Sequence, residues 1–156
     1  MKERNGIGTW NTILILGFFI AFAVVKLLEL RFPTAVIELK GERLSVLVAK
    51  NNFQQRKGVG GREALYPYDG MLFLFFSASR QQIVMRDMNF PIDIVWLRGK
   101  EVVDMAKAVM PELGKTESEL TRYTPRGEAN MVLELPAGWV DRHGLLIGDT
   151  MQVVHE

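Results

Sequence analysis

The stretch Gly70 to Leu97, GMLFLFFSASRQQIVMRDMNFPIDIVWL, decides the fold that the sequence predicts. It contains an apolar run from Met71 to Phe76 and a second run, led by a proline, from Pro91 to Leu97. Apolar runs of this length between turn signals are typical of strands that are covered on both faces. The sequence therefore predicts a β-rich core with two of its central strands in this stretch.

Charged residues interrupt this apolar stretch: Arg86 stands beside Asp87, and Asp93 lies within the second run. A buried carboxylate is destabilising unless it is paired or hydrogen-bonded. We predict that Asp93 accepts backbone N–H groups of the turn at 87–91 and pairs with an arginine, for which Arg86 is the expected partner. The alternative is a ligand site, in which Arg86 binds an anion or changes the pKa of one carboxyl group.

A further acid, Glu134, stands inside the apolar tetrapeptide VLEL. We expect it to form a buried ion pair with Arg62 or Arg86. An alternative is a site for a hard cation, built from the carboxylates of Asp87, Asp93 and Glu134. The candidate ligand-binding or structural polar cluster therefore comprises Arg62, Arg86, Asp87, Asp93 and Glu134.

The composition excludes several classes of function. The net charge of +1 and the scattered basic residues give no electrostatic basis for binding nucleic acid. The absence of cysteine excludes disulfides, thiolate zinc sites and a thiol nucleophile. His143 and His155 lack the HExxH spacing of zinc hydrolases, and no GxSxG motif is present. The sequence therefore assigns no catalytic residue, no cofactor and no metal.

The first 31 residues differ in composition from the rest of the chain. The run from Ile13 to Val25, ILILGFFIAFAVV, carries no charge, and 21 residues separate Trp10 from Phe32. A helix of that length covers roughly 30 Å at ~1.5 Å per residue, which is the hydrocarbon thickness of a bilayer. We predict that residues 1–31 form an N-terminal membrane anchor, a single transmembrane helix that contacts the lipid bilayer through residues 12–31.

Two alternatives to an anchor remain. A cleaved signal peptide is favoured by the small-x-small sequence Ala21-Phe22-Ala23, although this lies inside the apolar run rather than after it. A buried core helix is disfavoured because the run is apolar on all sides. Gly17 and Ala21 form a small-xxx-small pair, which would suit contact with a membrane protein partner.

The basic residues around this segment conflict over its orientation. Lys2 and Arg4 favour an N-terminus in the cytoplasm. The opposite orientation is favoured by the basic residues that follow the run, namely Lys26, Arg31, Lys40 and Arg43. Because short tails before a first apolar segment commonly stay inside, we predict a single-pass membrane protein with its soluble domain on the extracytoplasmic side.

After Pro33 the pattern predicts a separate soluble domain over residues 32–156. A period-two pattern predicts a β-hairpin over 36–48, and Asn51 and Gly58 are expected to begin and end a short helix. Further strands are expected at 101–109, 129–135 and 151–154, with a short helix at 139–143 and a long surface loop at 110–128. The predicted class is α+β: a single compact, mainly antiparallel β domain with short helices, preceded by one transmembrane helix.

An ordered set of short motifs resembles the domain of unknown function family 192. Each motif is weak alone, but their order is specific: Arg56-Lys57-Gly58, Gly70-Met71-Leu72-Phe73, Met85-Arg86-Asp87-Met88 with Pro91-Ile92-Asp93, Val132 to Gly138, and Gly148-Asp149. The resemblance covers roughly residues 44–154. It implies a small β-rich domain, often carried behind an export signal or anchor, and it implies no established activity, substrate or cofactor. This chain has Val84 where a tryptophan is common and Met88 where a threonine is common, which suggests a pocket of different shape.

Taken together, these features predict a membrane-tethered extracytoplasmic accessory or binding module of unknown ligand. One alternative is a small hydrolase-like enzyme that uses a carboxylate-arginine site. Another is a subunit of a membrane assembly, held through its helix.

Overall fold

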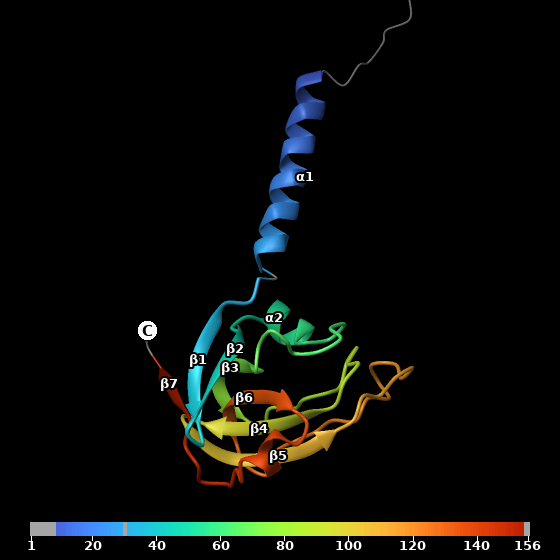
Figure 1. Ribbon diagram of the computed structural model, residues 1–156. Helices are drawn as coiled ribbons and strands as arrows, with labels where there is room; N and C mark the ends of the chain where they lie inside the picture. Colours follow the sequence, from blue (N-terminus) through green and yellow to red (C-terminus); the bar gives the residue numbers. More distant parts are fainter. Residues whose placement is uncertain (1–8, 30, 155–156) are drawn as a thin grey trace, which may run out of the picture. The chain divides into compact units, whose positions relative to one another are not determined.

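The computed structural model describes residues 9–29 and 31–154, which form two compact units, Met1–Arg31 and Phe32–Glu156 (Figure 1). The division between the two units falls after Arg31. Lys2, Arg4 and His155 lie outside the described residues.

The first unit contains one helix, α1 (Thr9–Glu29), and its side chains at 10–25 are exposed. Among the residues that the structure describes, no helix has both the length and the apolar character needed to cross a membrane. The expected transmembrane helix is therefore not supported.

The second unit is the expected compact α+β domain. Its seven strands are β1 (Thr34–Leu39), β2 (Glu42–Ala49), β3 (Gly70–Ser79), β4 (Ile92–Arg98), β5 (Glu101–Val109), β6 (Ala129–Pro136) and β7 (Gln152–Val154). Its two short helices are α2 (Asn52–Lys57) and α3 (Trp139–Arg142). The strands form one mixed sheet in the order β5-β4-β6-β3-β2-β1-β7, in which β2 and β3 are parallel and the other described pairs antiparallel.

The two edges of this sheet are joined by the segment that leads into β7. The N–H group of Val102, in β5, donates to the carbonyl of Asp149 at 2.8 Å, and Met151 N–H donates to Lys100 O at 2.8 Å. Glu101 and Thr150 form a further antiparallel bridge. Because β7 also pairs with β1, these bonds continue the sheet from β5 back to its other edge.

The hairpin turn and the short helix α2 form where the local sequence predicted them. Lys40 and Gly41 take φ angles of +56° and +79°, which is the conformation that a two-residue hairpin turn between β1 and β2 requires. The Asn51 side chain accepts the N–H group of Gln54 at 2.9 Å and so caps α2. Gly58, with a φ of +49°, ends that helix as expected.

The sheet has a buried cluster on each face. We call one the loop face, because the segments 59–65, 83–88 and 109–132 supply many of its members; it comprises Leu47, Ala49, Val59, Leu65, Met71, Phe73, Ile83, Met85, Met88, Ile92, Ile94, Trp96, Val109, Ala129 and Val132. The other we call the helix face, because α3 supplies part of it; it comprises Ile37, Leu39, Leu44, Val46, Leu72, Val95, Leu97, Val102, Leu133, Leu135, Trp139, Val140, Leu145 and Met151. The strands of the stretch 70–97 supply both clusters, as their double-sided apolar runs predicted.

Candidate functional site

Asp93 lies on β4, fully buried, on the helix face. Its Oδ1 accepts the N–H group of Ala108 at 2.7 Å, and its Oδ2 accepts the N–H group of Val140 at 2.9 Å. Ala108 has a φ of +49° in an irregular part of β5, and Val140 lies in the first turn of α3. The carboxylate therefore joins three elements. The expected backbone hydrogen bonds form, but their donors are Ala108 and Val140 and not the turn at 87–91.

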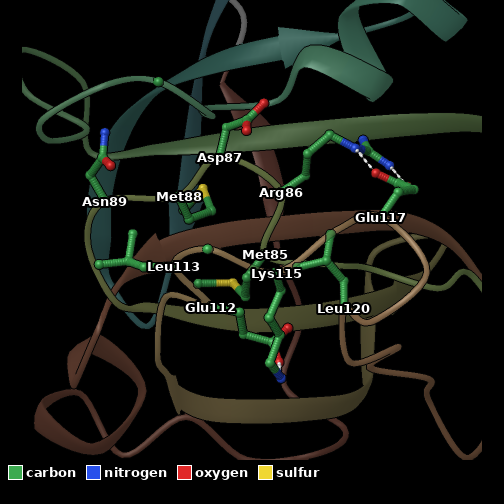
Figure 2. A pocket seen from close by; sticks show the side chains of 12 residues that line it. Met85, Arg86, Asp87, Met88, Asn89, Glu112, Leu113, Lys115, Glu117 and Leu120 are labelled. Carbon is green, nitrogen blue, oxygen red and sulfur yellow. Dashed lines mark hydrogen bonds and ion pairs between the residues drawn. The ribbon is translucent and has the colours of Figure 1, made fainter.

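Arg86 does not pair with Asp93, contrary to the prediction. Its Nε donates to Glu117 Oε2 at 2.6 Å, its Nη2 donates to Glu117 Oε1, and its Nη1 donates to the carbonyl of Arg56 at 2.9 Å (Figure 2). These hydrogen bonds raise the pKa of Arg86 and lower that of the Glu117 carboxyl group. The partner is different because Asp93 points to the helix face, whereas Arg86 lies in the segment that covers the loop face.

The Arg86–Glu117 pair closes one side of a cavity of about 440 Å³ (Figure 2). The segment 85–89 forms one wall of this cavity and the loop at 112–120 forms the other. That loop is the long surface loop expected at 110–128, and it is fixed to the domain at several points: Tyr123 forms a bridge with Ile83, and Arg126 binds Asp104 at 2.7 Å. The residues that line the 440 Å³ cavity carry charges of both signs, so this cavity by itself does not select a class of ligand.

Glu134 occupies the middle of the loop face. It lies opposite Met71 of β3 and Ile94 of β4, so its side chain shares a face with theirs. Only 5% of Glu134 is exposed, and its Oε2 has no hydrogen-bond partner in the described part of the chain. Burial raises the pKa of this carboxyl group to about 8. The expected ion pair with Arg62 or Arg86 is therefore wrong.

Glu134 lines a second cavity, of about 120 Å³, which we call the Glu134 cavity. Apolar side chains and the glycine-rich turn after α2 line it together with the carboxyl group. Three basic residues also line it, Arg56 and Lys57 at the end of α2 and Arg86 from the segment 80–91. The remaining lining residues are Gln55, Gly58, Val59, Gly60, Phe73, Gln82, Ile83, Val84 and Met88.

The two other candidates, Arg62 and Asp87, accept hydrogen bonds with their backbone carbonyls. Arg62 accepts the side-chain amide of Asn89 with its carbonyl at 3.0 Å. Asp87 is exposed, has a φ of +53°, and accepts the N–H group of Gly61 at 2.7 Å. A Cβ atom on Gly60 would lie 2.7 Å from Arg86 O, so this glycine allows the two loops to touch. The glycine run thus packs against a loop.

The five candidate residues therefore do not form one cluster. Asp93 and Glu134 lie on opposite faces of the sheet, because Asp93 is paired with Leu135, one position along β6 from Glu134. No group of three potential metal ligands occurs among the described residues, so the hard-cation site is not formed there.

Sequence reasoning missed Glu117, Arg56 and Lys57. Arg56 and Lys57 were noted only as part of a motif, and Glu117 is one of several acids in a polar loop. Nothing in the local pattern shows that this loop lies against the segment 85–89. A basic pair at the end of a short helix, followed by glycines, was the one available signal.

Among curated proteins, none matches this sequence. The fold is similar to that of a "putative transcription regulator" from Sinorhizobium meliloti, with a TM-score of 0.70 and 24% identity over 78% of this chain and 95% of the other. It is also similar to a protein of unknown function from Novosphingobium aromaticivorans, with a TM-score of 0.64 and 23% identity over 78% and 84% of the two chains. Residues 35–153 match DUF192, "Uncharacterized ACR, COG1430", and the chain therefore belongs to this family.

Proposed function

We propose that this protein is an accessory module that binds a small ligand in the Glu134 cavity and catalyses no reaction. The observation that carries the proposal is the Oε2 atom of Glu134, which is buried, has no partner and lines a cavity. Buried polar atoms almost always have hydrogen-bond partners, and one without a partner costs about 1–3 kcal/mol. Residues that reduce stability in this way are often retained for function.

Binding is favoured over catalysis because the buried acids are not arranged as a pair. The two oxygens of Asp93 are both engaged with backbone N–H groups on the helix face. Glu134 lies on the opposite face, and among the described residues no second acid lines its cavity. General acid–base chemistry of the hydrolase type uses two groups that reach the same substrate.

The test is the stability of the full chain with Glu134→Leu, measured by thermal unfolding at pH 7. If the carboxyl group is there to meet a ligand, an apolar side chain of similar size should raise the melting temperature. Asp93→Leu serves as the matched control, because it removes a buried acid that has both partners, and it should lower the melting temperature. A Glu134→Leu protein that melts as far below the wild type as Asp93→Leu does would make Glu134 a structural residue and remove the proposal.

We also propose that residues 1–31 tether the module to a membrane, with residues 34–156 on the extracytoplasmic side. What supports the tether is the run from Ile13 to Val25, which carries no charge, and the exposure of the apolar side chains along the described part of α1, for example Leu14 and Phe18 at 68%. An apolar surface of this extent is typical of a site that contacts lipid or another protein.

Carbonate extraction of membranes and the mass of the mature protein test this tether. The anchored chain should remain in the membrane fraction with residues 1–31 still attached. A mature chain that begins near Val24 would show a cleaved signal peptide instead. A reporter fused after Glu156 should be active only outside the cytoplasm, and cytoplasmic activity would reverse the orientation.

A further inference from the structure

We propose that the ligand of the Glu134 cavity is a small organic anion that also carries an uncharged hydroxyl or amide group. The uncharged group meets Glu134, and the anionic group, a carboxylate or a phosphate, meets Arg56, Lys57 and Arg86. This inference rests on the proposed function and adds to it the chemical class of the ligand.

Within the cavity, Glu134 requires an uncharged polar partner. With a pKa of about 8, the carboxyl group of Glu134 is mainly protonated at pH 7, so it can donate one hydrogen bond and accept others. Apolar side chains of the loop face, among them Val59, Phe73 and Ile83, line the cavity with it. A hydroxyl or amide group can satisfy Oε2 there without bringing a second charge into the core.

The basic residues that line the cavity favour an anion. The charged and titratable groups that line the cavity besides Glu134 are Arg56 and Lys57 from α2 and Arg86 from the segment 80–91. The neighbouring strands β3 and β4 place only uncharged Met71 and Ile94 beside Glu134. Glu117 balances the charge of Arg86, so the positive charge of Arg56 and Lys57 remains, and it favours an anionic ligand over a cationic one.

Glu134 and the three basic residues line the same cavity, so one ligand can contact both kinds of group. Arg86 is held in place by Glu117 and by the carbonyl of Arg56, so little ordering is needed when an anion arrives.

The size of the cavity limits the ligand to a few non-hydrogen atoms. Its volume of about 120 Å³ is well below the ~300–1,000 Å³ of pockets for drug-sized ligands. A short hydroxy acid, or the hydroxyl end of a small phosphate ester, has suitable dimensions and both kinds of polar group.

Titration calorimetry of the full chain in mild detergent tests this ligand class with four probes. Glycolate carries a carboxylate and a hydroxyl group, and glycerol 1-phosphate carries a phosphate and hydroxyl groups, so the tighter of the two identifies the anion. Acetate lacks the hydroxyl group, and ethanolamine carries a cation in place of the anion. We expect one of the two hydroxyl-bearing anions to bind at least tenfold more tightly than acetate or ethanolamine.

The pH dependence of binding provides a second readout. Because the protonated carboxyl group is the binding form, the affinity should fall about tenfold from pH 7 to pH 9 when the pKa is about 8. Glu134→Gln keeps a donor and an acceptor, so it should bind at pH 7 and lose this pH dependence. The double variant Arg56→Gln, Lys57→Gln should lose at least tenfold in affinity, whereas Lys100→Gln, at an exposed turn away from the cavity, should not change it.

Tighter binding of ethanolamine than of either anion, or an affinity that rises with pH, would overturn the inference in favour of a cationic ligand. Failure of all four probes to bind would overturn it as well. In both cases the melting temperature of Glu134→Leu would still test the proposed function separately.

Discussion

Asp93 and Glu134 are buried acids on adjacent strands, one register position apart, and their environments differ in nearly every respect. Asp93 lies on the helix face, and each of its carboxylate oxygens accepts a backbone N–H group. Glu134, on the loop face, has an oxygen without a partner and a cavity in front of it. Burial alone therefore does not identify a site. What separates the two acids is whether the fold itself satisfies the carboxyl group.

The largest effect is expected from Asp93→Leu. It leaves the N–H group of Val140 buried without an acceptor, which costs about 1–3 kcal/mol, and it also removes the acceptor of the partly buried N–H group of Ala108, so we expect a loss of roughly 2–4 kcal/mol. Asp93→Asn keeps one acceptor oxygen and should lose less. Urea unfolding of the full chain measures both. Asp141→Asn, at an exposed acid of α3, is the control and should stay within about 0.5 kcal/mol of the wild type.

The next largest effect is expected in the pH dependence of stability that Glu134 causes. The folded pKa of Glu134 is raised, so its protonated form favours the native state below the unfolded pKa near 4.5, and that advantage is lost as the pH rises through about 8. Between these values the wild type should lose about 1.4 kcal/mol per pH unit relative to Glu134→Gln. Unfolding curves of both proteins at pH 5, 6, 7 and 8 provide this difference. Parallel curves would show that Glu134 is ionised throughout.

A smaller effect is expected from Gly60→Ala. The added methyl group would lie 2.7 Å from the carbonyl of Arg86, so the covering loops must separate, which should cost about 1–3 kcal/mol. Gly127→Ala is the matched control because its Cβ meets nothing within 4 Å. Thermal unfolding measures the two variants. Equal melting temperatures would mean that the loop face is loosely packed around the Glu134 cavity.

The smallest change in stability is expected from Arg86→Lys. Glu117 and Arg86 pair near the surface, where ion pairs contribute little, so the melting temperature should fall less than in Gly60→Ala. Lysine cannot make the bidentate contact with Glu117 and, at the same time, the hydrogen bond to Arg56 O. Hydrogen exchange should therefore increase in the loop at 112–120. Unchanged exchange in that loop would show that the pair does not hold it.

Much of the fold could be predicted because its signals are local. Period-two patterns marked the hairpin of β1 and β2, Asn51 marked the start of α2, and the apolar runs of the stretch 70–97 marked β3 and β4. The parallel pairing of β2 with β3, and the segment that joins the sheet edges, depend on residues far apart in the chain. No local pattern encodes them.

The site was less predictable than the fold for the same reason. That Asp93 would accept backbone N–H groups follows from its place in an apolar strand, but which groups donate depends on where β5 and α3 lie. Glu134 was recognised as unusual because it interrupts an apolar run. Its lack of a partner could not be recognised, because the basic residues that line its cavity belong to α2 and to the segment 80–91, and the sequence does not reveal where these lie.

The bonds between residues 148–151 and β5 have a consequence for the synthesis of the protein. The last described strand, β7, pairs with the first, β1, so the sheet cannot be completed until the end of the domain has left the ribosome. Until then both β1 and β5 present unpaired backbone groups, which are the usual starting points for aggregation. A chain that stops before Gly148 would keep these edges permanently open.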